Sequence, residues 1–255
     1  MRYNVFGGTF SGPFRKNKAF YFLSYEAARR RDGTTVTMTV PSALERAGDF
    51  SQTFNANGRL AIVYDPNSGP PASRTAFPGN RIPTDRLDPV ALNVIQAYPL
   101  PNRAPDNVAG SNNFSASTVN VLDRDNVTAK AGYNVTGAHK LSGRFLWNRQ
   151  DQAPRSVYAD PAAEPSSTRN GGGWNLLGSW TAILSPTMIS EFRAARVMRT
   201  ALVFSPSIGQ HYPTKLGLRG IPDDAFPRFN LTGYTALGSN QQTRHQPGLR
   251  HARCG

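Results

Sequence analysis

The chain has 255 residues, of which 29 are Lys or Arg and 16 are Asp or Glu, so its formal net charge is +13. Its 20 prolines and 23 glycines disfavour helix and strand interiors, which argues against a helical bundle or an α/β enzyme. Charged residues make up 18% and hydrophobic residues 38%, which is typical neither of a disordered tail nor of an apolar helical membrane protein. No run approaches the roughly 20 consecutive apolar residues of a spanning helix, so a bilayer would be crossed only by a closed β-barrel.

The ends of the sequence carry no recognisable signal. Residues 1–7 lack the apolar run and the small-residue cleavage site of a signal peptide. The lone Cys254 can form neither an intrachain disulfide nor a metal cluster. We therefore expect the sequence to be truncated at both ends.

The first predicted unit, residues 1–32, is a β-hairpin. Residues 3–12 lead through the polar turn 15–18 into residues 19–29, whose aromatic density is typical of strands. Residues 33–120 follow as one long connection that contains two short helices. Ser42 is the predicted N-cap of a helix over 43–47, and Asp88 with Pro89 starts another that continues to Ala97.

Two further hairpins occupy residues 121–204. Polar and apolar residues alternate with period two over 126–135 and again over 139–148, which predicts two strands of about ten residues. The third hairpin runs from 173 to 184 and returns from 188 to 204, and residues 205–255 form a loop and a truncated C-terminal region. Short turns that alternate with long connections predict an all-β fold: a partial antiparallel transmembrane β-barrel with extracellular loops.

Short blocks in the first part of the chain resemble one known family. In order along the chain they are NVFGGTFSGP (4–13), KNKAFYF (16–22), SYE (24–26), VPS (40–42), RAGDFS (46–51), YDP (64–66), FPGNRIP (77–83), DRLDPVA (85–91) and YPLPN (98–102). The series, with a looser continuation through 126–149, is similar to the early barrel of TonB-dependent receptors of the Oar-like type.

The resemblance implies a bacterial outer-membrane barrel of roughly 22 strands, preceded by a plug domain and often by a carboxypeptidase-regulatory-like β-sandwich. Such receptors are thought to bind or import bulky ligands with energy that TonB passes from the inner membrane. The chain lacks the energy-coupling box, the plug and the closing strands. We therefore expect a fragment of such a receptor in the outer membrane, in contact with lipid and lipopolysaccharide and coupled to TonB through a missing N-terminal part.

Face alternation predicts which side chains meet which surroundings. The candidates for lining a polar lumen are Ser142, Arg144, Asn148, Glu191 and Arg193. The candidates for aromatic side chains at the membrane interface are Tyr21, Tyr25, Trp147, Trp174 and Trp180, although the same rings could stack against a ligand. The long connection 33–120 is expected to contact the ligand.

The sequence offers little for other function classes. The basic run 29–31 lacks a nucleic-acid-binding motif, and the four histidines have no metal-ligand spacing, so we expect no nucleic acid partner and no catalysis.

Paired carboxylates at 123/125 and 223/224 leave open a cation site, against the simpler role of arginine partners. The glycines 171–173 lack a following Lys-Ser/Thr, so we expect a flexible loop and no phosphate or other cofactor. The alternative to a receptor is a surface-exposed structural or adhesive β-protein that transports nothing.

Overall fold

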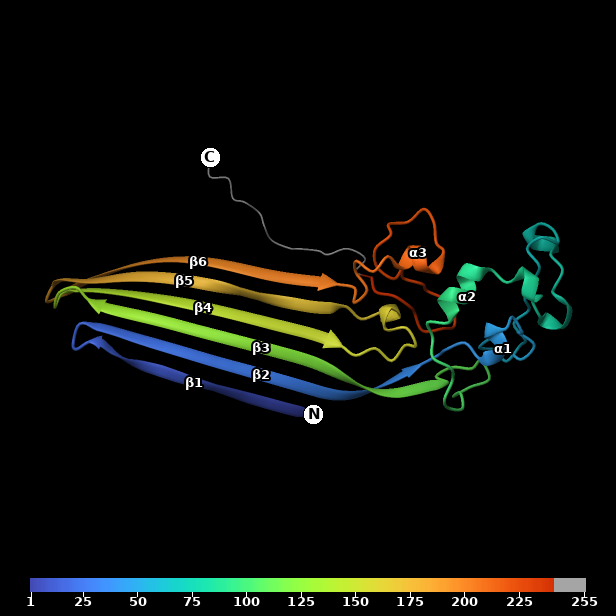
Figure 1. Cartoon of the computed structure of the whole chain (residues 1–255), viewed down its shortest axis with the longest axis horizontal. Coiled ribbons are helices and arrows are strands. Elements are labelled where there is room, and N and C mark those ends of the chain that lie inside the picture. Colours follow the sequence, from blue (N-terminus) through green and yellow to red (C-terminus); the bar gives the residue numbers. More distant parts are fainter. Residues whose placement is uncertain (241–255) are drawn as a thin grey trace.

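The protein forms one antiparallel sheet of six strands, in the order β1-β2-β3-β4-β5-β6 (Figure 1). The computed structural model describes residues 1–240. The strands are β1 (Arg2–Arg15), β2 (Ala19–Met38), β3 (Phe114–Asn134), β4 (His139–Pro154), β5 (Thr168–Ser185) and β6 (Met188–Phe204). Each strand pairs with its neighbour in the chain, so the sheet is a meander with open edges at β1 and β6. The all-β antiparallel prediction is confirmed.

The connections differ sharply between the two ends of the sheet. Short turns at 16–18, 135–138 and 186–187 close the hairpins at the end opposite the helices (Figure 1). The long connections at 39–113, 155–167 and 205–240 gather at the other end. No helix within residues 1–240 is long and apolar enough to cross a membrane.

Most strands are longer than the sequence pattern predicted, whereas β6 has the predicted bounds 188–204. The strands β3 and β4 have 21 and 16 residues rather than about ten, and β2 continues to Met38 and β3 begins at Phe114, beyond the expected boundaries at 32 and 121. The extension of β2 contains residues 34–37, all four of which have β-branched side chains that favour extended backbone. β5 likewise begins at Thr168, so the glycines 171–173 lie inside a strand and not in the flexible loop that we expected.

Two of the short helices lie where the sequence predicted them. In α1 (Ala43–Arg46) the Ser42 hydroxyl accepts from the backbone N–H of Glu45, and the Glu45 carboxylate accepts from the backbone N–H of Ser42. In α2 (Pro89–Ile95) the Asp88 carboxylate caps the first turn. The helix α3 (Tyr212–Leu216) was not predicted, because it has no side-chain cap. Single 3₁₀ turns lie at Pro71–Ser73, Pro78–Asn80, Thr84–Arg86 and Pro161–Ala163.

The three long connections fold together into one unit, which we call the loop domain (39–113, 155–167 and 205–240). The main hydrophobic core of the described chain lies here and at the adjoining strand ends, with Tyr98 and Phe226 fully buried. The other buried members are Met38, Val40, Val94, Ala97, Phe114, Tyr158, Ala162, Ala163, Leu216 and Leu237. Each connection contributes apolar side chains to this one core, so the side chains of each connection are buried by those of the other two.

Polar contacts join the first and last connections of the loop domain. The Thr235 N–H donates to the Thr39 carbonyl oxygen at 3.0 Å, and the Thr39 N–H donates to the Thr235 hydroxyl at 3.0 Å. The Tyr98 hydroxyl donates to the Thr235 carbonyl, and burial raises the pKa of Tyr98 to about 12, so the phenol remains a donor. These bonds fix the last connection against the first.

Glu45 accepts hydrogen bonds from three different parts of the loop domain. Its oxygens accept from the Ser42 N–H at 2.7 Å, the Thr53 hydroxyl at 2.8 Å and the Tyr234 hydroxyl at 2.8 Å. Burial alone would raise the pKa of Glu45, but these hydrogen bonds hold it below its ordinary 4.5. The ionised carboxylate thus links α1 to the last connection.

Replacing Tyr234 with Phe should destabilise the loop domain by about 1.5–3 kcal/mol, because the half-buried Glu45 carboxylate loses a donor. The contribution of Glu45 is complete above pH 4.5 and disappears as the pH falls through its lower folded pKa. Urea unfolding of the wild type and of Tyr234→Phe, followed by tyrosine fluorescence at pH 7 and at pH 3, measures both effects. An equal difference between the two proteins at both pH values would contradict the role of the charge.

The glycines of β5 differ in how closely the neighbouring backbone approaches. A Cβ atom on Gly173 would lie 2.2 Å from the Met198 carbonyl oxygen, whereas one on Gly171 would lie 3.5 Å from the Thr200 oxygen. The first distance is a clash and the second an ordinary contact. We therefore expect Gly173→Ala to destabilise the sheet by about 1–3 kcal/mol, and Gly171→Ala to leave it unchanged or slightly more stable. Urea unfolding in detergent micelles distinguishes the two variants.

Candidate functional site

The strand register divides the side chains of the sheet between two faces. Trp147 lies opposite Val127 and Trp174, and Val127 lies opposite Tyr25, so these side chains share one face, which we call the aromatic face. The residues between them point to the other side, which we call the polar face.

The aromatic face carries all five aromatic residues that the sequence singled out: Tyr21, Tyr25, Trp147, Trp174 and Trp180. Trp174 and Trp180 are six residues apart along β5, or roughly 20 Å at about 3.3 Å per residue. Between them Leu176 is 51% exposed, and Phe145 on β4 is 39% exposed. Such a continuous exposed apolar surface suits lipid rather than water.

The same face becomes charged toward the loop domain. Arg29 pairs with Asp125 at 2.7 Å, Arg31 with Asp123 at 2.5 Å, and Arg149 with Asp151 at 2.7 Å. Asp125 also accepts from the Tyr25 hydroxyl at 2.7 Å. The carboxylates at 123 and 125 are therefore arginine partners, as the simpler interpretation expected.

The second carboxylate pair is also occupied by groups of its own loop. Asp223 accepts from the Thr214 N–H at 2.9 Å and faces the His211 ring at 3.2 Å, and the Thr214 hydrogen bond lowers the pKa of Asp223. The Asp224 carboxylate accepts from the Gly209 N–H. Within residues 1–240, no group of three or more His, Cys, Asp or Glu side chains is placed to hold a metal ion. Cys254 lies outside the described residues.

The polar face carries all five residues predicted to line a lumen: Ser142, Arg144, Asn148, Glu191 and Arg193. The hydroxyls of Ser142 and Ser179 lie 2.6 Å apart on neighbouring strands. Glu191 accepts two hydrogen bonds from Arg193, at 2.8 and 2.9 Å. The structure brings these residues onto one face, while their exposure to a water-filled interior stays a prediction.

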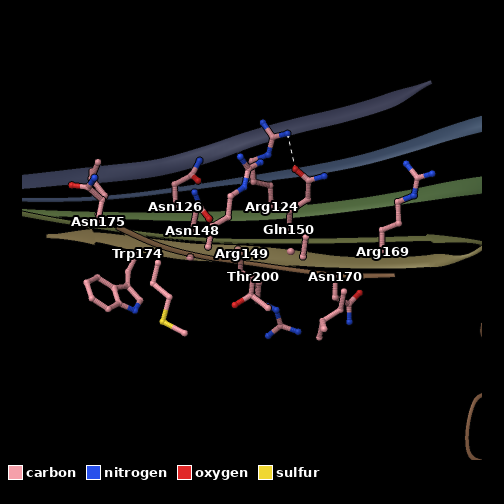
Figure 2. A pocket seen from close by; sticks show the side chains of 18 of the residues that line it. Arg124, Asn126, Asn148, Arg149, Gln150, Arg169, Asn170, Trp174, Asn175 and Thr200 are labelled. Atoms are coloured by element: carbon pink, nitrogen blue, oxygen red, sulfur yellow. Dashed lines mark hydrogen bonds between the residues drawn. The ribbon is translucent and has the colours of Figure 1, made fainter. Parts of the chain in front are cut away.

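A hollow that the sequence did not reveal lies on the same face, over β3, β4, β5 and β6 (Figure 2). Its volume is about 610 Å³, and Arg124, Arg169 and Arg199 are among its lining residues. Gly171 and Gly173 lie between these arginines in the register, and because they have no side chains they leave the space above the sheet unfilled. Figure 2 shows Arg124, Asn148 and Arg169 on one side of the sheet and Trp174 on the other. We call this feature the arginine hollow. No local pattern of the sequence reveals it, because its three arginines lie on three different strands.

Comparison with known proteins shows the family of the chain. The family model described as "Outer membrane beta barrel domain" matches residues 1–251. The chain belongs to this family. No curated protein and no solved structure matches it. As an outer membrane β-barrel protein, it is located in the outer membrane, as the sequence predicted.

Membership of the family explains why the two faces of the sheet differ in polarity. Strands of outer-membrane barrels alternate apolar outward and polar inward, with aromatic girdles at both interfaces. The aromatic face therefore has the character of a lipid-facing surface and the polar face that of a barrel interior. Arg196 is a charged residue of the aromatic face that lies away from the ion pairs beside the loop domain, and its guanidinium lies 5.9 Å from the centre of the Trp174 ring.

Cysteine labelling tests this assignment directly. In a Cys254→Ser background, Leu176→Cys should react with a lipid-soluble maleimide and Asn148→Cys with a charged, water-soluble one. The reason is that Leu176 projects from the aromatic face and Asn148 from the polar face. Mass spectrometry of the protein in outer-membrane vesicles quantifies both adducts, and the reverse pattern of labelling would show that the two faces are exchanged.

Proposed function

We propose that this chain is part of the barrel of a TonB-dependent receptor of the Oar-like type, which binds and imports a bulky ligand across the outer membrane. The observation that carries the proposal is the pair of open edges. β1 and β6 each pair on one side only, and six strands are fewer than the eight of the smallest outer-membrane barrels. Because unpaired backbone groups are costly in lipid, the edges require further strands. A larger barrel, of the size that such receptors have, meets this requirement.

The loop domain supports a receptor function. Outer-membrane barrels have short periplasmic turns and long extracellular loops, so the loop domain would stand outside the cell. Its core and its polar contacts give it a defined shape rather than a set of independent loops. The ligand would first meet the connection 39–113, and the polar face would then line its passage.

The proposal also assigns partners. Lipid would cover the aromatic face. Lipopolysaccharide phosphates would bind the arginines of this face beside the loop domain. Arg149 is the most exposed of Arg29, Arg31 and Arg149, with 61% of its side chain accessible. TonB would act through a part of the protein that precedes this chain. We assign the chain no catalytic role and no nucleic acid partner.

Energy dependence of ligand uptake tests the receptor proposal. Cells that produce the protein should accumulate its ligand only when TonB is present and the inner-membrane proton gradient is intact. Binding of the ligand at the cell surface should persist after the gradient is collapsed. Uptake that continues at the same rate without TonB would contradict the proposal.

One observation favours the alternative of an adhesive surface protein. The loop domain exposes apolar side chains, among them Tyr64 (52%), Leu100 (57%) and Val108 (66%). Such residues are enriched at protein-binding surfaces. Cell attachment that is lost with Tyr64→Ser and Leu100→Ser, without any TonB-dependent uptake in the wild type, would favour adhesion.

A further inference from the structure

The arginine charges of the hollow are not neutralised by carboxylates of the described chain. Among residues 1–240, the guanidinium groups of Arg169 and Arg199 have no hydrogen-bond or ion-pair partner, and that of Arg124 donates only to the Gln150 amide oxygen, at 3.0 Å. On the aromatic face, by contrast, Arg29 and Arg31 each have a carboxylate partner. A cluster of unpaired guanidinium groups is an attractive site for an anion.

The nearest carboxylates do not fill the hollow. Glu26 lies at its rim, where its oxygen accepts from the Asn126 amide at 3.4 Å. The other two carboxylates of the polar face, Asp32 and Glu191, are paired with Arg30 at 2.6 Å and with Arg193. The field within the hollow is therefore set by its arginines.

The register places the three arginines around a common centre. Arg124 lies opposite Gln150, which lies opposite Gly171, and Asn148 lies opposite Gly173, which lies opposite Arg199. Arg169 occupies the next position of the same face on β5. Arg124 and Arg199 are three strands and two residues apart, which at about 4.8 Å between strands and about 3.3 Å per residue is roughly 16 Å. Their long side chains can thus reach one ligand above the two glycines.

Four primary amides of the polar face also line the hollow, and amides pair well with hydroxyl groups. They are Asn126, Asn148, Gln150 and Asn175 (Figure 2). The Oδ1 atom of Asn175 is buried and accepts no hydrogen bond from the described chain. A buried acceptor without a donor is costly, and a ligand hydroxyl would satisfy it. The volume of about 610 Å³ is within the range of small-molecule sites.

We propose that the arginine hollow binds a hydroxyl-rich oxyanion, that is, a sugar acid or a sugar phosphate. The arginines bind the carboxylate or phosphate group and the amides bind the hydroxyls. The inference deepens the receptor proposal by naming a ligand class, but binding to the hollow does not depend on TonB.

Calorimetry tests the proposal by measuring which small molecules bind to the protein after its extraction from outer membranes in detergent. The probes are galacturonate, glucose 6-phosphate, glucose and inorganic phosphate. We expect one or both hydroxyl-rich anions to bind and to outcompete inorganic phosphate, and glucose to bind at least tenfold more weakly. A preference for galacturonate or for glucose 6-phosphate distinguishes the carboxylate from the phosphate. Equal binding of glucose, or binding of neither anion, would overturn the proposal.

Variants locate the site. Arg199→Gln should weaken binding about 10- to 100-fold, since it removes a charge-assisted contact. Arg193→Gln is the matched control on the same strand and face, because Glu191 already neutralises Arg193. Gly171→Leu should block the hollow while it keeps all three arginines, and circular dichroism shows whether each variant retains its β-sheet. Equal loss in Arg193→Gln, or full binding in Gly171→Leu, would contradict the site.

The two proposals fail in different ways. Anion binding that persists while uptake proves independent of TonB would contradict the receptor and leave the site intact. TonB-dependent uptake of a ligand by a protein whose hollow binds no anion would contradict the site and leave the receptor intact.

Discussion

The structure depends on an unbroken antiparallel register through the central strands. From Phe114 to Tyr133, β3 pairs with β2 on one side, and most of its length also pairs with β4, without a bulge. Since side chains alternate between faces, a slip of one residue would move Trp147 from the aromatic to the polar face and Asn148 the other way. In an outer-membrane protein such a slip would expose amides and arginines to lipid. The register and the environment therefore select the same arrangement.

The long connections solve a different physical problem from the strands. The sheet has a single layer and buries few of its side chains, so it provides no core of its own. The loop domain does provide one, because its three connections meet at the same end and pool residues such as Tyr98, Tyr158 and Phe226. Glu45 and Thr235 then join its first and last parts through hydrogen bonds. Ordered loops of this kind can present a fixed surface to a ligand.

The arginines of the sheet differ in whether they have a carboxylate partner. On the aromatic face, Arg29, Arg31 and Arg149 are matched with aspartates on strands, at the level where the apolar surface gives way to charge. On the polar face, Arg169 and Arg199 keep their guanidinium groups free within the described residues. Matched pairs neutralise a surface, whereas unmatched ones leave a positive potential that a ligand can meet. The distinction rests on partners rather than on residue type.

The sequence by itself determined the all-β class, the three hairpins, the helices at Ser42 and Asp88, and which residues share a face, because period-two alternation and caps are local signals. It did not determine the full length of the strands, the helix α3 or the loop domain, because these depend on pairing and packing between segments far apart in the chain. The sequence did not determine the arginine hollow either. Arg124, Arg169 and Arg199 are separated by tens of residues, and only the register of four strands brings them around Gly171 and Gly173.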